Sequence, residues 1–130
     1  MSNRKLGENF EVELAEILFN NGYWVHRLKQ NADGQPADII AVKNRKAYLI
    51  DAKVCSNGFF DCSRVEPNQH LAMKMWENCG NHTGWFALKF DDRIAMLPAY
   101  VALDDNVKKV NRQLAENVCI PLEMWMVVNG

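Results

Sequence analysis

Apolar and polar positions divide the chain into alternating helical and extended segments. Apolar residues recur at helical spacing over residues 6–20, so we expect an amphipathic first helix that stops at Asn20-Asn21-Gly22. Short apolar runs predict strands over residues 23–28, 85–90 and 93–97. Two further runs flank the polar corner at residues 43–46 and predict a β-hairpin over residues 36–53. A second helix is expected over residues 67–79, with Pro67 in its first turn.

The expected order is helix, three strands, helix, then two strands. This order predicts an α/β fold with a mixed central β-sheet flanked by helices and excludes a doubly wound fold. A length of 130 residues favours a single domain, with its core at about residues 6–97. Residues 98–130 form an extension in which 104–116 is expected to be partly helical and 120–126 a short closing helix. The segment 120–128 is rich in Met and Trp, which makes it a candidate interface.

Composition excludes few classes of function. Fifteen Lys and Arg against sixteen Asp and Glu give a net charge of −1, so global charge does not argue for a nucleic-acid partner. The four cysteines contain no Cys-x-x-Cys pair, which disfavours a zinc knuckle. No export signal or membrane-spanning run is visible, so we expect reduced thiols and a cytoplasmic protein of a bacterial, archaeal or phage-infected cell.

The hairpin carries the chemistry. Asp38 opens its first strand and Asp51-x-Lys53 closes the second, so antiparallel pairing brings these residues together. Magnesium prefers oxygen ligands, usually one or two carboxylates together with water and phosphate oxygens. Asp38, Asp51 and the Ala52 carbonyl could supply them, while the Lys53 ammonium could orient a water or stabilise charge on a phosphate. The competing interpretation is a surface salt-bridge cluster at a strand end.

These motifs resemble a known superfamily. Pro36-x-Asp38 followed by Asp51-x-Lys53, after an N-terminal helix with Glu, resembles the PD-(D/E)XK nucleases. Within that superfamily the chain is most similar to the small Holliday-junction resolvases of phages, archaea and Gram-positive bacteria. Two details depart from the usual pattern: Ala37 separates Pro36 from Asp38, and Asp51 stands where Glu is common.

The resemblance assigns further residues over residues 6–90. Gly7-x-x-x-Glu11 matches the first family motif, which makes Glu11 the helix acid that reaches the metal through water, with Glu8 as its competitor. Gln69 matches the Gln that the family often has at the start of the second helix, which favours a site role; the alternative is an exposed helix residue. The implied catalytic group is therefore Glu11, Asp38, Asp51, Lys53 and Gln69.

Only some of the basic residues are candidates for contacts with DNA. Arg27 and Lys29 precede the loop that leads to Asp38, and Ser63 and Arg64 precede Gln69, so each could bind a phosphate. Solvated surface charge is the alternative for each of them. Hairpin geometry places the basic corner at residues 43–46 far from the acids.

The resemblance implies a restriction-endonuclease-like core and a metal-dependent endonuclease that resolves four-way DNA junctions by phosphodiester hydrolysis. It implies Mg²⁺ as cofactor, with Mn²⁺ as a substitute, and a homodimer acting on branched DNA. Two alternatives stay open: another endonuclease of the superfamily, of restriction or repair type, and a catalytically silent DNA-binding module of the same fold.

Overall fold

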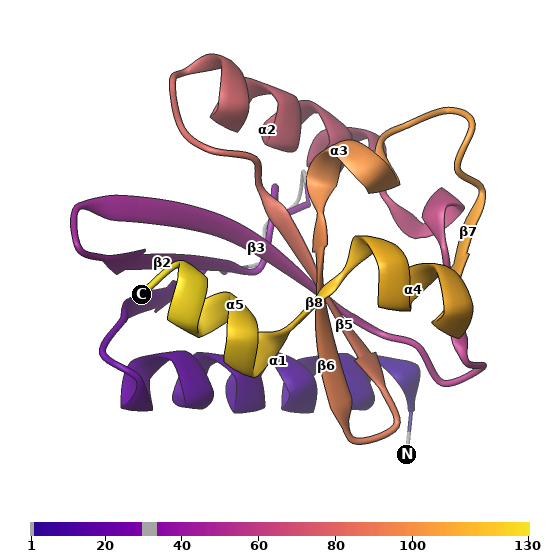
Figure 1. Ribbon diagram of the computed structural model, residues 1–130, viewed down its shortest axis with the longest axis horizontal. Helices are drawn as coiled ribbons and strands as arrows, with labels where there is room; N and C mark the ends of the chain where they lie inside the picture. The colour runs from indigo at the N-terminus through magenta and orange to yellow at the C-terminus, as the bar shows by residue number, and fades with distance from the viewer. Residues whose placement is uncertain (1, 30–33) are drawn as a thin grey trace.

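A mixed six-stranded sheet lies between two layers of helices (Figure 1). The structure is a computed structural model that describes residues 2–29 and 34–130. Neighbouring strands are antiparallel except for the central pair β3 and β5, which is parallel. In sheet order the strands are β1 (Trp24–Arg27), β2 (Ile39–Lys43), β3 (Lys46–Val54), β5 (Trp85–Phe90), β6 (Arg93–Pro98) and β8 (Ile120–Pro121).

The helices cover both faces of this sheet. Ser2 caps the first helix by accepting a hydrogen bond from the Lys5 amide, so this helix begins three residues before the expected start. The helices are α1 (Asn3–Asn20), the 3-10 helix η1 (Cys62–Arg64), α2 (Pro67–Asn78), α3 (Ala99–Ala102), α4 (Arg112–Val118) and α5 (Leu122–Val128). None of the helices in the described ranges has both the length and the apolar character needed to cross a membrane.

The predicted hairpin forms from β2 and β3. Asn44 and Arg45 connect the strands with φ values of 51° and 68°, the positive angles that a two-residue type I′ turn requires. Ile39 pairs with Ile50, and the same register places Asp38 opposite Asp51. The turn therefore sets which acidic residues meet at the other end of the hairpin.

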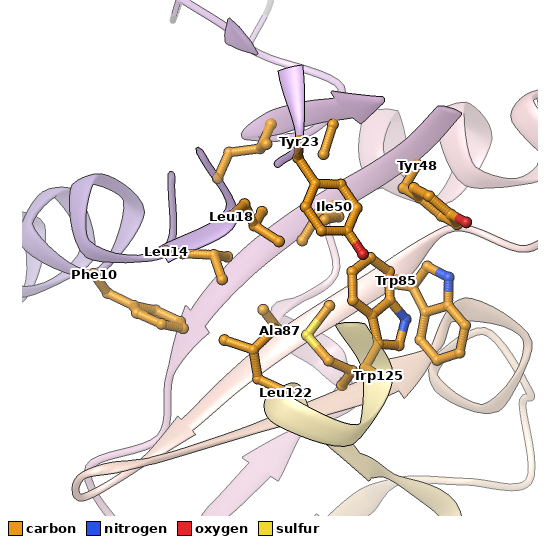
Figure 2. Packing of buried hydrophobic residues seen from close by; sticks show 13 residues of the cluster. Phe10, Leu14, Leu18, Tyr23, Tyr48, Ile50, Trp85, Ala87, Leu122 and Trp125 are labelled. Atoms are coloured by element: carbon orange, nitrogen blue, oxygen red, sulfur yellow. The ribbon is translucent and has the colours of Figure 1, made fainter. Parts of the chain in front are cut away.

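Alternation along the central strands supplies two hydrophobic cores. Ile50 of β3 packs on the side of α1 and α5, whereas the adjacent Leu49 packs on the side of α2, α3 and α4. Figure 2 shows the first of these cores, where side chains of α1 and α5 meet those of the sheet.

The end of the described chain belongs to the first core. Trp125 of α5 is fully buried, stacks on Tyr23 with ring centroids 5.9 Å apart and meets Trp85 edge to face (Figure 2). The hydroxyls of Tyr23 and Tyr48 both donate hydrogen bonds to the Asn129 carbonyl, at 2.9 and 3.1 Å. Residues 122–129 are thus tied to the sheet by packing and by hydrogen bonds.

Some local expectations for the C-terminal part were incomplete. The helix expected within residues 104–116 is present only as α4, and it follows a short strand, β7 (Lys109–Asn111). That strand pairs with β4 (Phe59–Asp61) in a separate two-stranded sheet, which the sequence did not predict. The closing segment expected as a helix over residues 120–126 begins as strand β8 and becomes helical at Leu122. Strands of two or three residues are too short to show a periodicity, and their partners lie far away in the sequence.

Candidate active site

Asp38 and Asp51 lie side by side at one end of the β2–β3 hairpin. Asp38 is 7% exposed and Asp51 is fully buried. The Ala52 amide donates a hydrogen bond to Asp38 Oδ2 at 2.7 Å, and the Asp38 amide donates to the Ile50 carbonyl at 3.1 Å. Main-chain groups of β3 therefore fix the position of the Asp38 carboxylate.

Lys53 shares a face of β3 with Asp51, because residues two apart on a strand point the same way. Its Nζ lies 2.9 Å from Asp51 Oδ2. The two groups form an ion pair, and among the described residues Asp51 Oδ2 has no further polar partner. A buried carboxylate oxygen of this kind is available to a cation.

Gln69 connects helix α2 to both residues. It occupies the third position of α2 in a capping box, where its Oε1 accepts the Glu66 amide at 3.1 Å. The same side chain donates through Nε2 to Asp51 Oδ1 at 3.3 Å and accepts from Lys53 Nζ at 3.3 Å. The helix cap therefore orients a site residue, and Gln69 is buried, with 6% exposure.

Glu11 of α1 faces the same region from the other layer. Its Oε1 lies 3.5 Å from the Arg27 guanidinium of β1. Burial and then the negative charge of Asp38 raise the pKa of Glu11 to about 7, against the lowering effect of Arg27. Glu8 instead lies on the exposed surface of α1, 3.7 Å from Arg4.

Burial also dominates the electrostatics of Asp51. Loss of hydration raises its pKa well above the ordinary range, the neighbouring Asp38 charge adds to this, and Lys53 opposes it. Two carboxylates held together out of water need a cation or a proton, and one ammonium is present.

The four expected DNA contacts have different surroundings. Lys29 and Ser63 are exposed. Arg27 is exposed but paired with Glu11. Arg64 donates to the Val54 carbonyl at 2.8 Å and lies over the Phe60 ring, so it also braces the end of β3.

Sequence reasoning missed two amides. Gln35 donates a hydrogen bond to Asp38 Oδ1, and Asn68 of α2 donates to the Gln35 carbonyl at 2.8 Å. Only their nearness in sequence to Asp38 and Gln69 could have suggested them, because isolated amides carry no motif.

The donor set fits a hard divalent cation. Nowhere in residues 2–29 and 34–130 do three His, Cys, Asp or Glu side chains form a ready metal cage. Two carboxylates, one with a buried oxygen free of hydrogen bonds, are nevertheless the usual protein share of a magnesium site that is completed by water and phosphate.

Fold and site together define the class. A mixed sheet with helices on both faces, whose central hairpin ends in two acids and a lysine, is the arrangement of a restriction-endonuclease-like nuclease. The family model of the archaeal Holliday junction resolvase (Hjc) matches residues 1–127, and the chain belongs to this family, which is part of the PD-(D/E)XK superfamily. It is therefore a nuclease that acts on DNA phosphodiester bonds and resolves Holliday junctions.

A solved structure supports the fold. The chain is similar to Archaeoglobus fulgidus Hjc, a Holliday junction resolvase from an archaeal hyperthermophile, with a TM-score of 0.72 and 18% identity. The match covers 93% of this chain and 95% of the other. Among curated proteins, no sequence matches this chain. Resolvases of this family generally depend on a divalent metal, and their substrate is branched DNA.

Proposed function

We propose that Asp38, Asp51 and the Ala52 carbonyl hold Mg²⁺, with Mn²⁺ as a substitute, and that this site cleaves the strands of a four-way junction. The observation that carries the proposal is the buried pair of opposed carboxylates with the Lys53 ammonium 2.9 Å from one of them. A surface salt-bridge cluster, the competing interpretation, would be exposed to solvent.

Each protein group has a distinct task in this proposal. The bound cation would lower the pKa of a water molecule and offset the charge that develops on the phosphate. Lys53 stabilises negative charge on the scissile phosphate and orients the attacking water through its remaining N–H groups. Gln69 holds Lys53 and Asp51 in their relative positions, because it bonds to both.

Glu11 is our choice for the helix acid, acting on the metal through water. The negative charge of Asp38 raises the pKa of the Glu11 carboxyl, whereas Glu8 pairs with Arg4 on the exposed side of the helix. A carboxyl whose pKa is about 7 can hold or release a proton near neutral pH, which suits a group that orients water.

We place DNA phosphates against Arg27, Lys29, Ser63 and Arg64. Lys29 precedes the two acids in the sequence and Ser63 follows them, and both side chains are exposed. Arg64 already uses one N–H group on the Val54 carbonyl, and a guanidinium has others to offer. Phosphate contacts of this kind orient the substrate and carry no base sequence.

We further propose that the chain acts as one nuclease domain and as a homodimer in the cytoplasm, where its DNA substrate lies. A two-fold dimer would present two active sites to a four-way junction with matching symmetry. In residues 98–130, Trp125 belongs to the core, whereas Met124, Val127 and Val128 are exposed on α5 and form the candidate interface. Sedimentation of the full chain tests the oligomeric state.

A nicking assay tests the central proposal. The full chain is incubated with a synthetic four-way junction, with linear duplex of the same sequence, and with Mg²⁺, Mn²⁺ or EDTA. We expect metal-dependent symmetric nicks in the junction alone. Equal rates on linear duplex would favour a restriction or repair type of nuclease, and junction binding without nicks would favour a silent DNA-binding module.

A further inference from the structure

Gln35 makes a contact with the site to which the proposed function assigns no role. Its side-chain amide donates to Asp38 Oδ1, while its main-chain carbonyl accepts a hydrogen bond from Asn68 of α2 at 2.8 Å. Gly34 precedes it with a φ of 79°, and a Cβ at Gly34 would lie 3.0 Å from the Asn68 amide. Glycine therefore allows the chain to pass close enough to α2 for Asn68 to hold it.

Both oxygens of Asp38 are consequently occupied by protein donors. Oδ2 accepts the Ala52 amide at 2.7 Å and Oδ1 accepts the Gln35 amide. Because the main-chain bond and 93% burial already fix the orientation of Asp38, the second donor adds little orientation. Its main effect is to compensate the negative charge of Asp38 beside Asp51.

We propose that Gln35 is a resident donor that occupies Asp38 Oδ1, and that a divalent cation binds by displacing this amide. The inference rests on the proposed metal role of Asp38. Asn68 bonds to the main chain of Gln35, so the amide can leave while the backbone stays in place. Gln35 would thereby set how tightly the site binds a divalent cation in the absence of DNA.

Metal affinity of the full chain tests the proposal directly. Isothermal titration with Mn²⁺ alone compares the natural protein with Gln35→Met, which keeps the length of the side chain and removes the donor. A hydrogen bond to a charged group contributes enough that we expect Gln35→Met to bind Mn²⁺ on the order of tenfold more tightly. The matched control is Gln113→Met, on the exposed surface of α4, whose affinity should equal that of the natural protein.

The variant Asp38→Asn distinguishes a failure of the role of Gln35 from a failure of the proposed metal site. Loss of Mn²⁺ binding in Asp38→Asn, with unchanged or weaker binding in Gln35→Met, would overturn the role of Gln35 and leave the proposed metal site intact. Unchanged Mn²⁺ binding in Asp38→Asn would overturn both.

A measurement on the unmodified chain removes any dependence on how the variants fold. In a titration with the diamagnetic ion Mg²⁺, the side-chain amide resonances of Gln35 should move toward those of a solvent-exposed amide. The main-chain amide resonances around Gln35 should move less. A Gln35 side-chain amide that keeps its resonance positions at saturating Mg²⁺ would show that the cation binds without displacing it.

Discussion

The Ala52 amide donates a hydrogen bond to Asp38 Oδ2 across 2.7 Å, so the second acidic motif of the chain positions the first. Asp38 precedes β2, and Ala52 belongs to β3 between Asp51 and Lys53. The donor is a main-chain amide, so the bond does not involve the Asp51 side chain. Substitution of the Asp51 side chain should therefore leave Asp38 in place, which makes clean tests of each acid feasible.

Asp51→Asn should lower the cleavage rate of a four-way junction by roughly a hundred- to a thousandfold, because it removes the buried charge that would hold the cation. Junction binding in Ca²⁺ should survive. Single-turnover nicking and gel-shift titration measure the two effects. A natural cleavage rate in this variant would place the metal elsewhere.

The same substitution should stabilise the protein in EDTA. Asp51 is fully buried beside Asp38, and its raised pKa means that its charged form opposes folding. We expect the free energy of unfolding of Asp51→Asn to exceed that of the natural chain at neutral pH. Urea denaturation with EDTA measures it, and a loss of stability would mean that Lys53 compensates the charge fully.

Glu11→Gln should impair junction cleavage much more than Glu8→Gln. The nearby charge of Asp38 raises the pKa of Glu11, whereas the Glu8–Arg4 pair is exposed and contributes little to stability. The two variants lie on one helix and make the same chemical change, so each serves as the control for the other. The reverse order of rates would assign the helix acid to Glu8.

Arg64→Ala should have two measurable effects. Loss of the bond to the Val54 carbonyl should reduce the free energy of unfolding by about 1 kcal/mol. Loss of a phosphate contact should reduce the salt slope of junction binding by about one. Arg45→Ala, at the exposed turn of the hairpin, is the matched control and should change neither. An unchanged slope for Arg64→Ala would restrict Arg64 to its bracing role.

Tyr23→Phe should cost about 1 kcal/mol of stability at neutral pH through the lost bond to the Asn129 carbonyl. Burial raises the pKa of Tyr23 to about 12 from 10.0. The folded-state pKa is the higher one, so the contribution of Tyr23 is complete below pH 10.0 and is lost as pH rises through about 12. Urea denaturation across this range should show a shallower alkaline loss in Tyr23→Phe than in the natural chain. Equal slopes would mean that Tyr23 does not titrate with unfolding.

The sequence predicted those parts of the fold that depend on local pattern. The hairpin of β2 and β3, both long helices and the β5–β6 pair follow from periodicity and turn chemistry over adjacent residues. The acids at the hairpin end followed from the same register, since Asp38 lies opposite Asp51. The proposed site role of Gln69 came from the family resemblance, because a glutamine in a capping box by itself indicates only the start of a helix.

Other features depend on contacts between distant segments. The pairing of β4 with β7 joins residues 59–61 to 109–111, and no local signal marks either strand. The contact of Gln35 with Asp38 requires a chain path set by Asn68 and Gly34. Sequence pattern specifies neither, because both depend on how separate elements pack.

The geometry of the candidate active site depends on segments that come much later in the chain. Strand β3 pairs in parallel with β5, and Trp125 of α5 packs in the core on one face of the sheet. Strand β3 carries Asp51 and Lys53, yet it gains its inner neighbour only when residues 85–90 are present. The core beneath it is filled by Leu122 and Trp125 near the end of the described chain. During synthesis, a chain that has emerged only as far as the hairpin holds both acids but lacks the support that fixes them. The two acids at the hairpin end therefore reach their described positions only when segments as distant as residues 85–90 and 122–125 have packed against the sheet.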